Sequence, residues 1–275
     1  MGAGAKLQVQ IVAFGQEGIE RVASHNHPVV SGVRWLVSLQ MPTGEEPNIP
    51  ESILSREDFD IIVHHDRGVS LNRNHALDYP SDAPYVLFGD DDVDYHEHGL
   101  KDLIEAFESN PSADIICCRY TSNGEYIKNY GSGIFSIRKP PKGWYIATFE
   151  VAFRRNFSPR VRFNENISIG AKHLICGEDS LWFRDMLHAG AQGLGMPIDL
   201  CEHNGPTTSE RHNRDSRLYF AKGAISTREH PVTWAPRLLA RGLRAPIPYL
   251  SYLRHTFSGA LFALRTGILR PSFQK

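Results

Sequence analysis

Short apolar segments typical of β-strands alternate with helical patterns over the first 120 residues. Consecutive parallel strands need a crossover between them, so this alternation predicts an α/β fold with a mainly parallel sheet flanked by helices. The expected strands are residues 7–14, 33–40, 60–65, 85–88, 114–119 and 144–153, and the expected helices are a short one from residue 51 and those at 71–77, 99–109 and 178–189. In such folds the functional side chains follow the carboxyl ends of the strands.

Charge is divided unevenly along the 275 residues, although the formal net charge is only −1. Residues 1–210 hold 18 Lys and Arg against 29 Asp and Glu, whereas residues 211–275 hold 12 against 2. We therefore predict a catalytic domain over residues 1–210 and a basic helical extension over residues 211–275. Clustered positive charge attracts anionic surfaces and phosphates.

The cysteines and the apolar segments predict the cellular compartment in which the protein lies. The four cysteines form no Cys-x-x-Cys pair, and a chain of this length needs no disulfide, so a reducing compartment is expected. The sequence has no signal-peptide pattern and no run of about 18 apolar residues. We predict a cytoplasmic protein whose contact with a membrane, if it has one, is peripheral and at the inner face.

Three consecutive carboxylates, Asp90, Asp91 and Asp92, directly follow the apolar strand pattern of residues 85–88. They would repel one another unless a cation or hydrogen-bond donors neutralised them, which predicts a divalent metal site for Mg²⁺ or Mn²⁺. The alternative is a solvated acidic turn. A calcium loop is excluded because Tyr95 and Lys101 occupy the positions of its glycine and its bidentate acid.

A second acidic pair, Glu178 and Asp179, follows Gly177 at the start of the predicted helix 178–189. The helix dipole would stabilise the ionised carboxylates there, whereas burial would raise their pKa values. The dipole would thus slightly weaken either carboxylate as a base, and burial would oppose that effect. A plain helix-capping role is the alternative, because acidic residues are common in first helical turns.

These motifs occur in an order that resembles the family 2 glycosyltransferases of the GT-A fold, over roughly residues 7 to 210. The resemblance rests on Arg67-Gly68, on Arg73-Asn74-His75-Ala76-Leu77, on the stretch YVLFGDDDV at 85–93, on Phe163-Asn164-Glu165 with Gly170, and on the stretch GEDS at 177–180. It implies an inverting, metal-assisted transfer of a sugar from a nucleotide diphosphate donor to an acceptor hydroxyl.

The resemblance also implies roles for residues at the donor. Asp90 and Asp92 match the family's DxD pair, with Asp92 as the more direct ligand of Mn²⁺ or Mg²⁺ and Asp91 in support. Ala13 and Arg73, with Asp90 and Asp91, are the residues expected to bind the nucleotide and its diphosphate.

Two further roles follow from the same resemblance. Asp179 matches the family's general base, with Glu178 beside it, and His203 lies where many GT-A enzymes place a late histidine on the metal. Because the chain has 13 histidines, a surface imidazole is the alternative for His203.

The sequence departs from the family in two places. Many relatives end their second strand with an acidic residue or Asn that contacts the nucleotide base. Here that strand ends Leu39-Gln40-Met41-Pro42, so the sequence does not identify the nucleotide of the donor. The Q-x-x-R-W signature of processive synthases is absent, since the one Arg-Trp pair is Arg34-Trp35. We therefore predict transfer of a single sugar.

The basic extension contains an apolar stripe with helical spacing after Pro246 and Pro248. The stripe consists of Leu250, Leu253, Phe257, Leu261, Leu264 and Ile268. With the arginines around it, this helix could lie on an anionic bilayer that carries a lipid-linked acceptor. Alternatively, it packs on the catalytic domain or on a second subunit. Few stacking aromatics accompany the basic residues, so nucleic acid is not an expected partner.

Further basic residues, Arg211, Arg214 and Lys222, could reach a diphosphate. The function predicted from the whole is synthesis of a bacterial surface polysaccharide or glycolipid with a saccharide or lipid-linked acceptor. A nucleotidyl- or phosphoryl-transfer enzyme using the same acidic turn, and a non-catalytic nucleotide-sugar-binding module, are the alternatives.

Overall fold

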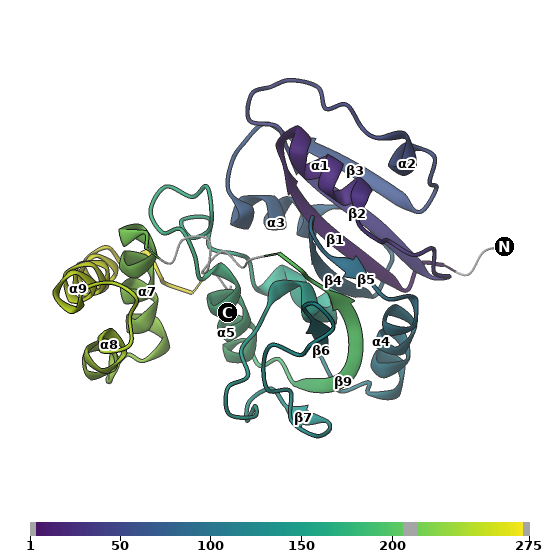
Figure 1. The fold of residues 1–275 in the computed structure, drawn as a ribbon. Helices are drawn as coiled ribbons and strands as arrows, with labels where there is room; N and C mark the ends of the chain where they lie inside the picture. Colours follow the sequence, from purple (N-terminus) through teal and green to yellow (C-terminus); the bar gives the residue numbers. More distant parts are fainter. Residues whose placement is uncertain (1–3, 206–213, 272–275) are drawn as a thin grey trace.

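The computed structural model describes residues 4–205 and 214–271, which form a central sheet with helices around it (Figure 1). The strands are β1 (Leu7–Phe14), β2 (Val33–Gln40), β3 (Phe59–His64), β4 (Tyr85–Asp90), β5 (Asp94–Tyr95), β6 (Ile115–Thr121), β7 (Phe135–Ser136), β8 (Val151–Arg154) and β9 (Gly193–Glu202). The helices are α1 (Gly15–Ser24), α2 (Glu51–Leu54), α3 (Val69–Asp78), α4 (Glu97–Ser109), α5 (Glu178–His188), α7 (Ser216–Glu229), α8 (Trp234–Gly242) and α9 (Tyr249–Thr266). The predicted α/β class is confirmed.

The sheet has the order β3-β2-β1-β4-β8-β6-β9-β5, with β7 paired to β9. Strands β3, β2, β1 and β4 are parallel, and Leu7 of β1 pairs with Val33 on one side and Tyr85 on the other. Strand β1 is buried on both faces except at its last residue, and its two buried glutamines, Gln8 and Gln10, hydrogen-bond to each other. The carboxyl ends of β1, β2 and β4 therefore meet at one edge, where the aspartates follow β4.

The second half of the sheet is mixed. Strand β8 is antiparallel to both β4 and β6, whereas β6 and β9 are parallel. The predicted strand 144–153 is wrong for residues 144–150, because Thr148–Glu150 form a 3-10 turn and only Val151–Arg154 pair as a strand. The side chain of Glu150 accepts a hydrogen bond from the backbone N–H of Ala147 and so closes this turn.

Six elements were not predicted from the sequence: α1, α7, α8, β9 and the two-residue strands β5 and β7. Strand β9 contains Pro197, which cannot donate to a ladder, and its pairing with β6 shifts register between Cys117 and Arg119. The freed carbonyl of Pro197 instead accepts a hydrogen bond from Arg119. This irregularity hides the strand pattern in the sequence.

Helices α7, α8 and α9 form a bundle beside α5 (Figure 1). A hydrophobic cluster that includes Leu181 of α5, Ala221 and Ile225 of α7 and Ala263 of α9 joins this bundle to the rest of the molecule. The ion pair between Arg228 and Asp185 links α7 to α5 as well. The predicted boundary between residues 210 and 211 lies outside the described residues.

The predicted helix of the basic extension is present as α9, but its buried face is not the predicted apolar stripe. The buried side chains are Tyr252, Thr256, Ala260 and Ala263, with Gly259 among them. In the stripe, Phe257 contacts the ring of Trp234, whereas Leu250, Leu261 and Leu264 are exposed. Over the part of the chain that the structure describes, we find no helix with both the length and the apolar character needed to cross a bilayer.

The close contact between α7 and α9 generates a prediction. A Cβ atom at Gly259 would lie 1.9 Å from the carbonyl oxygen of Phe220. Replacing a helical Gly with Ala normally stabilises a helix by about 1 kcal/mol. Here we expect Gly259→Ala to lower the free energy of unfolding by about 1–3 kcal/mol, because the helices must move apart. Thermal unfolding measures the change.

The control is Gly133→Ala, because a Cβ atom at Gly133 meets no other atom within 4 Å. An unchanged or higher melting temperature for Gly259→Ala would contradict the packing described for α7 and α9.

Candidate functional site

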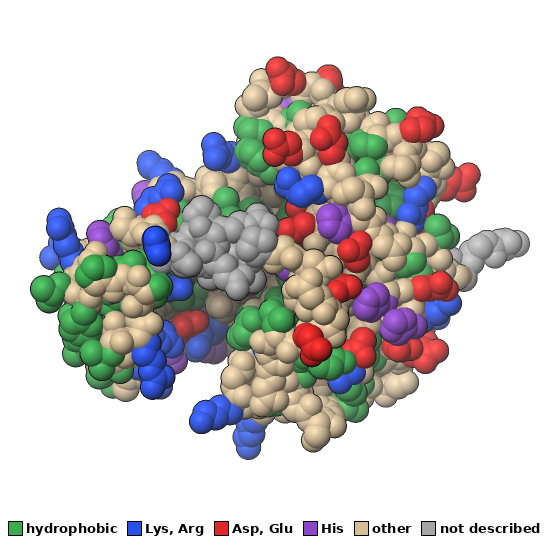
Figure 2. Space-filling model, in the orientation of Figure 1, with side chains coloured by type: hydrophobic (Ala, Val, Ile, Leu, Met, Phe, Trp, Pro, Cys, Tyr) green, Lys and Arg blue, Asp and Glu red, His purple; other side chains and the backbone are tan. Residues whose placement is uncertain are grey.

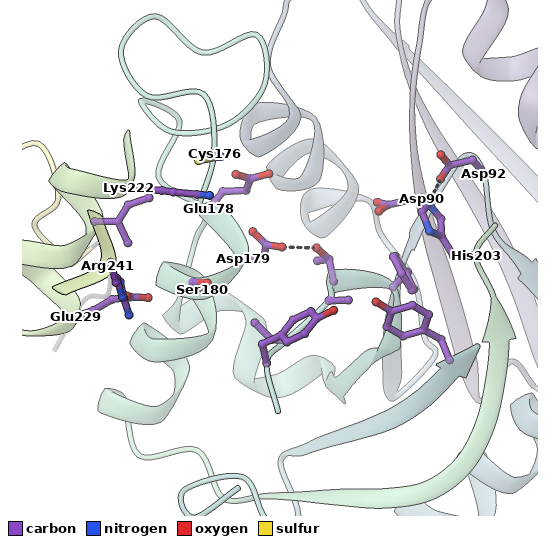
Figure 3. Close-up of a pocket in the computed structure, with 18 residues that line it drawn as sticks. Asp90, Asp92, Cys176, Glu178, Asp179, Ser180, His203, Lys222, Glu229 and Arg241 are labelled. Carbon is purple, nitrogen blue, oxygen red and sulfur yellow. Dashed lines mark hydrogen bonds and ion pairs between the residues drawn. The ribbon is translucent and has the colours of Figure 1, made fainter. Parts of the chain in front are cut away.

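Two cavities meet at the carboxyl edge of the sheet. The smaller one, of about 260 Å³, is the strand-end cavity; it is lined by residues that include Ala13, Phe14, Arg21, Gln40, Asn72 and Arg73. The larger one, of about 700 Å³, is the helix-side cavity; it is lined by residues that include 145–149, 176–180, Lys222, Glu229 and Arg241 (Figure 3). Both cavities are lined by Asp90, Asp92, Thr148, Glu178 and Asp179.

Arg73 and Asp90 form an ion pair at this junction. The Nη2 atom of Arg73 donates to Oδ1 of Asp90 over 2.8 Å. The Arg73 side chain is only 3% exposed and lies over the rings of Phe88 and Phe163. Its Nε and Nη1 atoms have no hydrogen-bond partner among the described residues, so the guanidinium has donors left for a ligand.

Asp91 lines the strand-end cavity with Asp90 and Asp92 and is paired with an arginine. Its carboxylate accepts a hydrogen bond of 2.6 Å from Arg21 of α1. Burial raises the pKa of Asp91 to about 6, although the guanidinium of Arg21 opposes this shift. Sequence reasoning missed Arg21 because α1 was not predicted. The helical spacing of Gly18, Ile19 and Val22, which are the buried residues of α1, is the signal that could have found it.

Asp92 and His203 lie together at the end of the helix-side cavity that is farthest from Lys222, Glu229 and Arg241 (Figure 3). The Nε2 atom of His203 is 3.4 Å from Oδ1 of Asp92, and its ring stacks on Phe149. His203 is buried, so its alternative as a surface imidazole is wrong. An imidazole and a carboxylate at this separation fit two ligands of one cation, and the softer nitrogen favours Mn²⁺ over Mg²⁺.

Of the three predicted metal ligands, Asp92 and His203 lie together but Asp90 does not join them. Asp90 faces Arg73 rather than His203. Within residues 4–205 and 214–271, no three His, Cys, Asp or Glu side chains are close enough to hold a metal ion by themselves.

Glu178 and Asp179 open α5 after Gly177, whose φ of +98° turns the chain into the helix. The hydroxyl of Thr148 donates to Oδ2 of Asp179 over 3.2 Å, while Oε2 of Glu178 has no partner in the described part of the chain. Burial raises the pKa values of both carboxyls, to about 8 for Glu178, and the charge of Arg73 opposes this effect. The hydrogen bond from Thr148 therefore orients Asp179, whereas one oxygen of Glu178 is left for a ligand.

A buried ion pair that sequence reasoning missed holds the loop of residues 145–149. Lys128 and Glu150 are paired, and both side chains are 0% exposed. Lys128 also donates to the carbonyl of Tyr145, and Glu150 accepts from Tyr130 over 2.9 Å. These bonds fix the loop that carries Thr148 to Asp179. No sequence motif signals the pair, because its members are 22 residues apart.

Gln40, the last residue of β2, lines the strand-end cavity at the position where many family members have an acidic residue or Asn. Gln40 donates to Asp66 over 2.6 Å, and its Oε1 atom accepts from the backbone N–H of Gly68. Asn72 donates to the carbonyl of Ala13, which fixes the end of β1 at the predicted position beside this cavity.

Residues 46–173, which include Arg73 and the three aspartates, match the family described as "Glycosyl transferase family 2". The resemblance expected from the motifs is confirmed over this part of the chain, and the match supports a glycosyltransferase. Among curated proteins, none matches the sequence.

The fold is similar to solved structures of TarS from S. aureus. For TarS 1-349 the TM-score is 0.55 at 13% identity, and the match covers 96% of this chain and 73% of that one. For TarS 1-349 in complex with UDP-GlcNAc the TM-score is 0.56 at 12% identity, with 95% and 73% covered. A longer TarS chain gives a TM-score of 0.56 at 12% identity, with 93% of this chain and 43% of that chain covered.

The raised pKa of Glu178 predicts a pH-dependent gain in stability. A carboxyl whose pKa is higher in the folded than in the unfolded state costs stability as pH rises from about 4.5 through about 8. Glu178→Gln removes this cost, so we expect its melting temperature to exceed that of the wild type by a few degrees at pH 8.5 and by less at pH 5. Calorimetric melting at both pH values measures the difference. A constant difference would contradict the raised pKa.

Proposed function

We propose that this chain is a glycosyltransferase that moves a single sugar from a nucleotide diphosphate donor to an acceptor hydroxyl, with inversion and with a divalent cation. The observation that carries the proposal is the position of Asp179, which lines both cavities beside Asp90, Asp92 and Thr148. A base there can reach an acceptor in one cavity and a donor in the other.

The donor nucleotide is assigned to the strand-end cavity. Nucleotides bind outside the carboxyl ends of parallel strands at the point where the strand order reverses, and this cavity opens beside the end of β1, which lies between β2 and β4. The unused donors of Arg73 suit the diphosphate. The complexes of TarS with UDP and with UDP-GlcNAc support a nucleotide-sugar donor.

The cation is assigned to Asp92 and His203, with Asp90 able to join them only if it leaves Arg73. Protein sites for Mg²⁺ and Mn²⁺ often use one or two side chains and complete their coordination with substrate phosphates and water. When bound, such a cation would offset the negative charge that develops on the departing diphosphate. The side-chain pair supplies the protein's share of that coordination.

The transfer step uses the carboxylate of Asp179. It accepts the proton of the acceptor hydroxyl while the hydroxyl oxygen forms a bond to the anomeric carbon. The bond from that carbon to the diphosphate oxygen breaks on the opposite face, and its electron pair leaves with the nucleoside diphosphate. One displacement inverts the anomeric configuration. Thr148 orients Asp179, and Arg73 stabilises its ionised form.

The proposed setting is synthesis of a surface polysaccharide or glycolipid at the inner face of the membrane, with a saccharide or lipid-linked acceptor. All four cysteines are free, which supports a reducing compartment. Figure 2 shows Lys and Arg side chains scattered among apolar ones on the visible face of the α7–α9 bundle at the left. The exposed Leu250, Leu261 and Leu264 support peripheral contact with an anionic bilayer.

Removal of the base tests the reaction. We expect Asp179→Asn to lower kcat by about 10²–10⁴-fold, because the amide cannot accept the hydroxyl proton. Donor affinity, measured by calorimetry, should stay close to the wild type. The control is Asp102→Asn, which neutralises an exposed carboxylate on α4. Normal turnover by Asp179→Asn would refute the proposal.

The donor and the cation are tested together by thermal unfolding with a panel of nucleotide sugars, with and without Mn²⁺. A ligand at 100 times its Kd stabilises the folded state by about 2.7 kcal/mol. We expect one donor to stabilise the protein only when Mn²⁺ is present, and expect Asp92→Asn and His203→Ala to lose this effect. Equal stabilisation with and without Mn²⁺ would refute the metal assignment. Release of a nucleoside diphosphate with that donor identifies sugar transfer.

A further inference from the structure

The far wall of the helix-side cavity is formed by the C-terminal bundle. Lys222 and Glu229 of α7 and Arg241 of α8 line the cavity that also contains Glu178 and Asp179. In Figure 3 these three side chains lie on the bundle side, while Asp92 and His203 lie at the opposite end. The cavity thus has an acidic end, a base near its middle and a wall that carries two cations.

The side chains of both cations are exposed to solvent at this wall. Within the described part of the chain, Lys222 forms no ion pair, and its ammonium has a weak contact with the Tyr219 ring at 5.8 Å. Partial burial lowers the pKa of Lys222, whereas Cys176 raises it and the charge of Arg241 lowers it. Glu229 is the one carboxylate on this wall.

Neighbouring charges do not change this balance. Arg228 is already paired with Asp185. The pKa of His230 is lowered by partial burial and by the charges of Arg237, Arg241 and Arg184, so positive potential extends around the wall. Residues 230–275 contain no Asp or Glu. A cavity wall with excess positive charge favours an anionic ligand.

We infer that Lys222 and Arg241 form an acceptor subsite that binds an anionic group, a phosphate or diphosphate, carried by the saccharide that is glycosylated. This inference rests on the proposed function, which assigns the donor to the strand-end cavity and leaves the helix-side cavity for the acceptor. An acceptor anchored by its phosphate on the bundle wall would extend its sugar toward Asp179.

The sequence predicts that Lys222 could reach a diphosphate, and the position of the cations argues against this being the diphosphate of the donor. Lys222 and Arg241 line the helix-side cavity and not the strand-end cavity, and they come from helices beyond α5. Of the other two residues in that prediction, Arg214 is exposed ahead of α7, and Arg211 lies outside the described residues.

Matched acceptors test the subsite. With the donor that the panel identifies, transfer to glucose 1-phosphate is compared with transfer to methyl glucoside, and transfer to N-acetylglucosamine 1-phosphate with transfer to its methyl glycoside. Products are measured by mass spectrometry. We expect kcat/KM to be about tenfold to a hundredfold higher for the phosphorylated member of each pair.

Variants of the wall locate the effect. Lys222→Met and Arg241→Gln should remove most of this preference by raising the KM for the phosphorylated acceptor, with the KM for the donor unchanged. The control, Arg244→Gln, removes an exposed cation that lies just after α8 and does not line the cavity, and it should retain the preference. A lipid-anchored sugar phosphate in detergent micelles, run beside the soluble one, distinguishes a lipid phosphate from a free one.

A second measurement keeps the inference testable if none of these sugars is glycosylated. Binding of glucose 1-phosphate and methyl glucoside to the Asp179→Asn protein, saturated with the nucleoside diphosphate and Mn²⁺, is followed by calorimetry. Phosphate-dependent binding that Lys222→Met weakens supports the subsite. Equal binding of both sugars, no binding of either, or a rise in the donor KM on Lys222→Met overturns it. The proposed function is tested separately: it fails if no nucleotide sugar in the panel raises the melting temperature of the protein.

Discussion

The buried guanidinium of Arg73 lies among carboxylates that could not otherwise share one recess. It forms an ion pair with Asp90, and its charge lowers the pKa values of Glu178 and Asp179 against the effect of burial. Because Arg73 is enclosed by two aromatic rings, its position is fixed before any ligand arrives. The buried guanidinium thus keeps these partly buried carboxylates ionisable.

The remaining parts of the site are held by elements that surround this charge. The ion pair between Lys128 and Glu150 fixes the turn that brings Thr148 to Asp179 and stacks Phe149 on His203. The C-terminal bundle, joined to α5 through Leu181 and Ala221, closes the other side of the helix-side cavity. The Lys128–Glu150 ion pair therefore positions one end of the helix-side cavity, and the apolar contact between α5 and α7 positions the other.

Prediction from the sequence succeeded where local pattern and burial agree. Strands β1 and β2 lie at the expected residues because most of each strand is buried and both are rich in apolar residues. It failed at residues 144–150, where aromatic spacing suggested a strand but the side chain of Glu150 turns the backbone. It also mistook the exposed leucines of α9 for its main apolar face, since small residues provide the contact with α7.

The sequence by itself determined the class of fold, the acidic turn after β4 and the acidic start of α5, because these depend on periodicity and on chemistry within a few neighbouring residues. Only the tertiary structure decided that Asp91 pairs with Arg21, that Asp92 meets His203, and that Lys222 enters the same cavity as Asp179. These partners are 43 to 111 residues apart. Their meeting depends on how the sheet order and the C-terminal bundle bring distant segments together, and no local pattern records that.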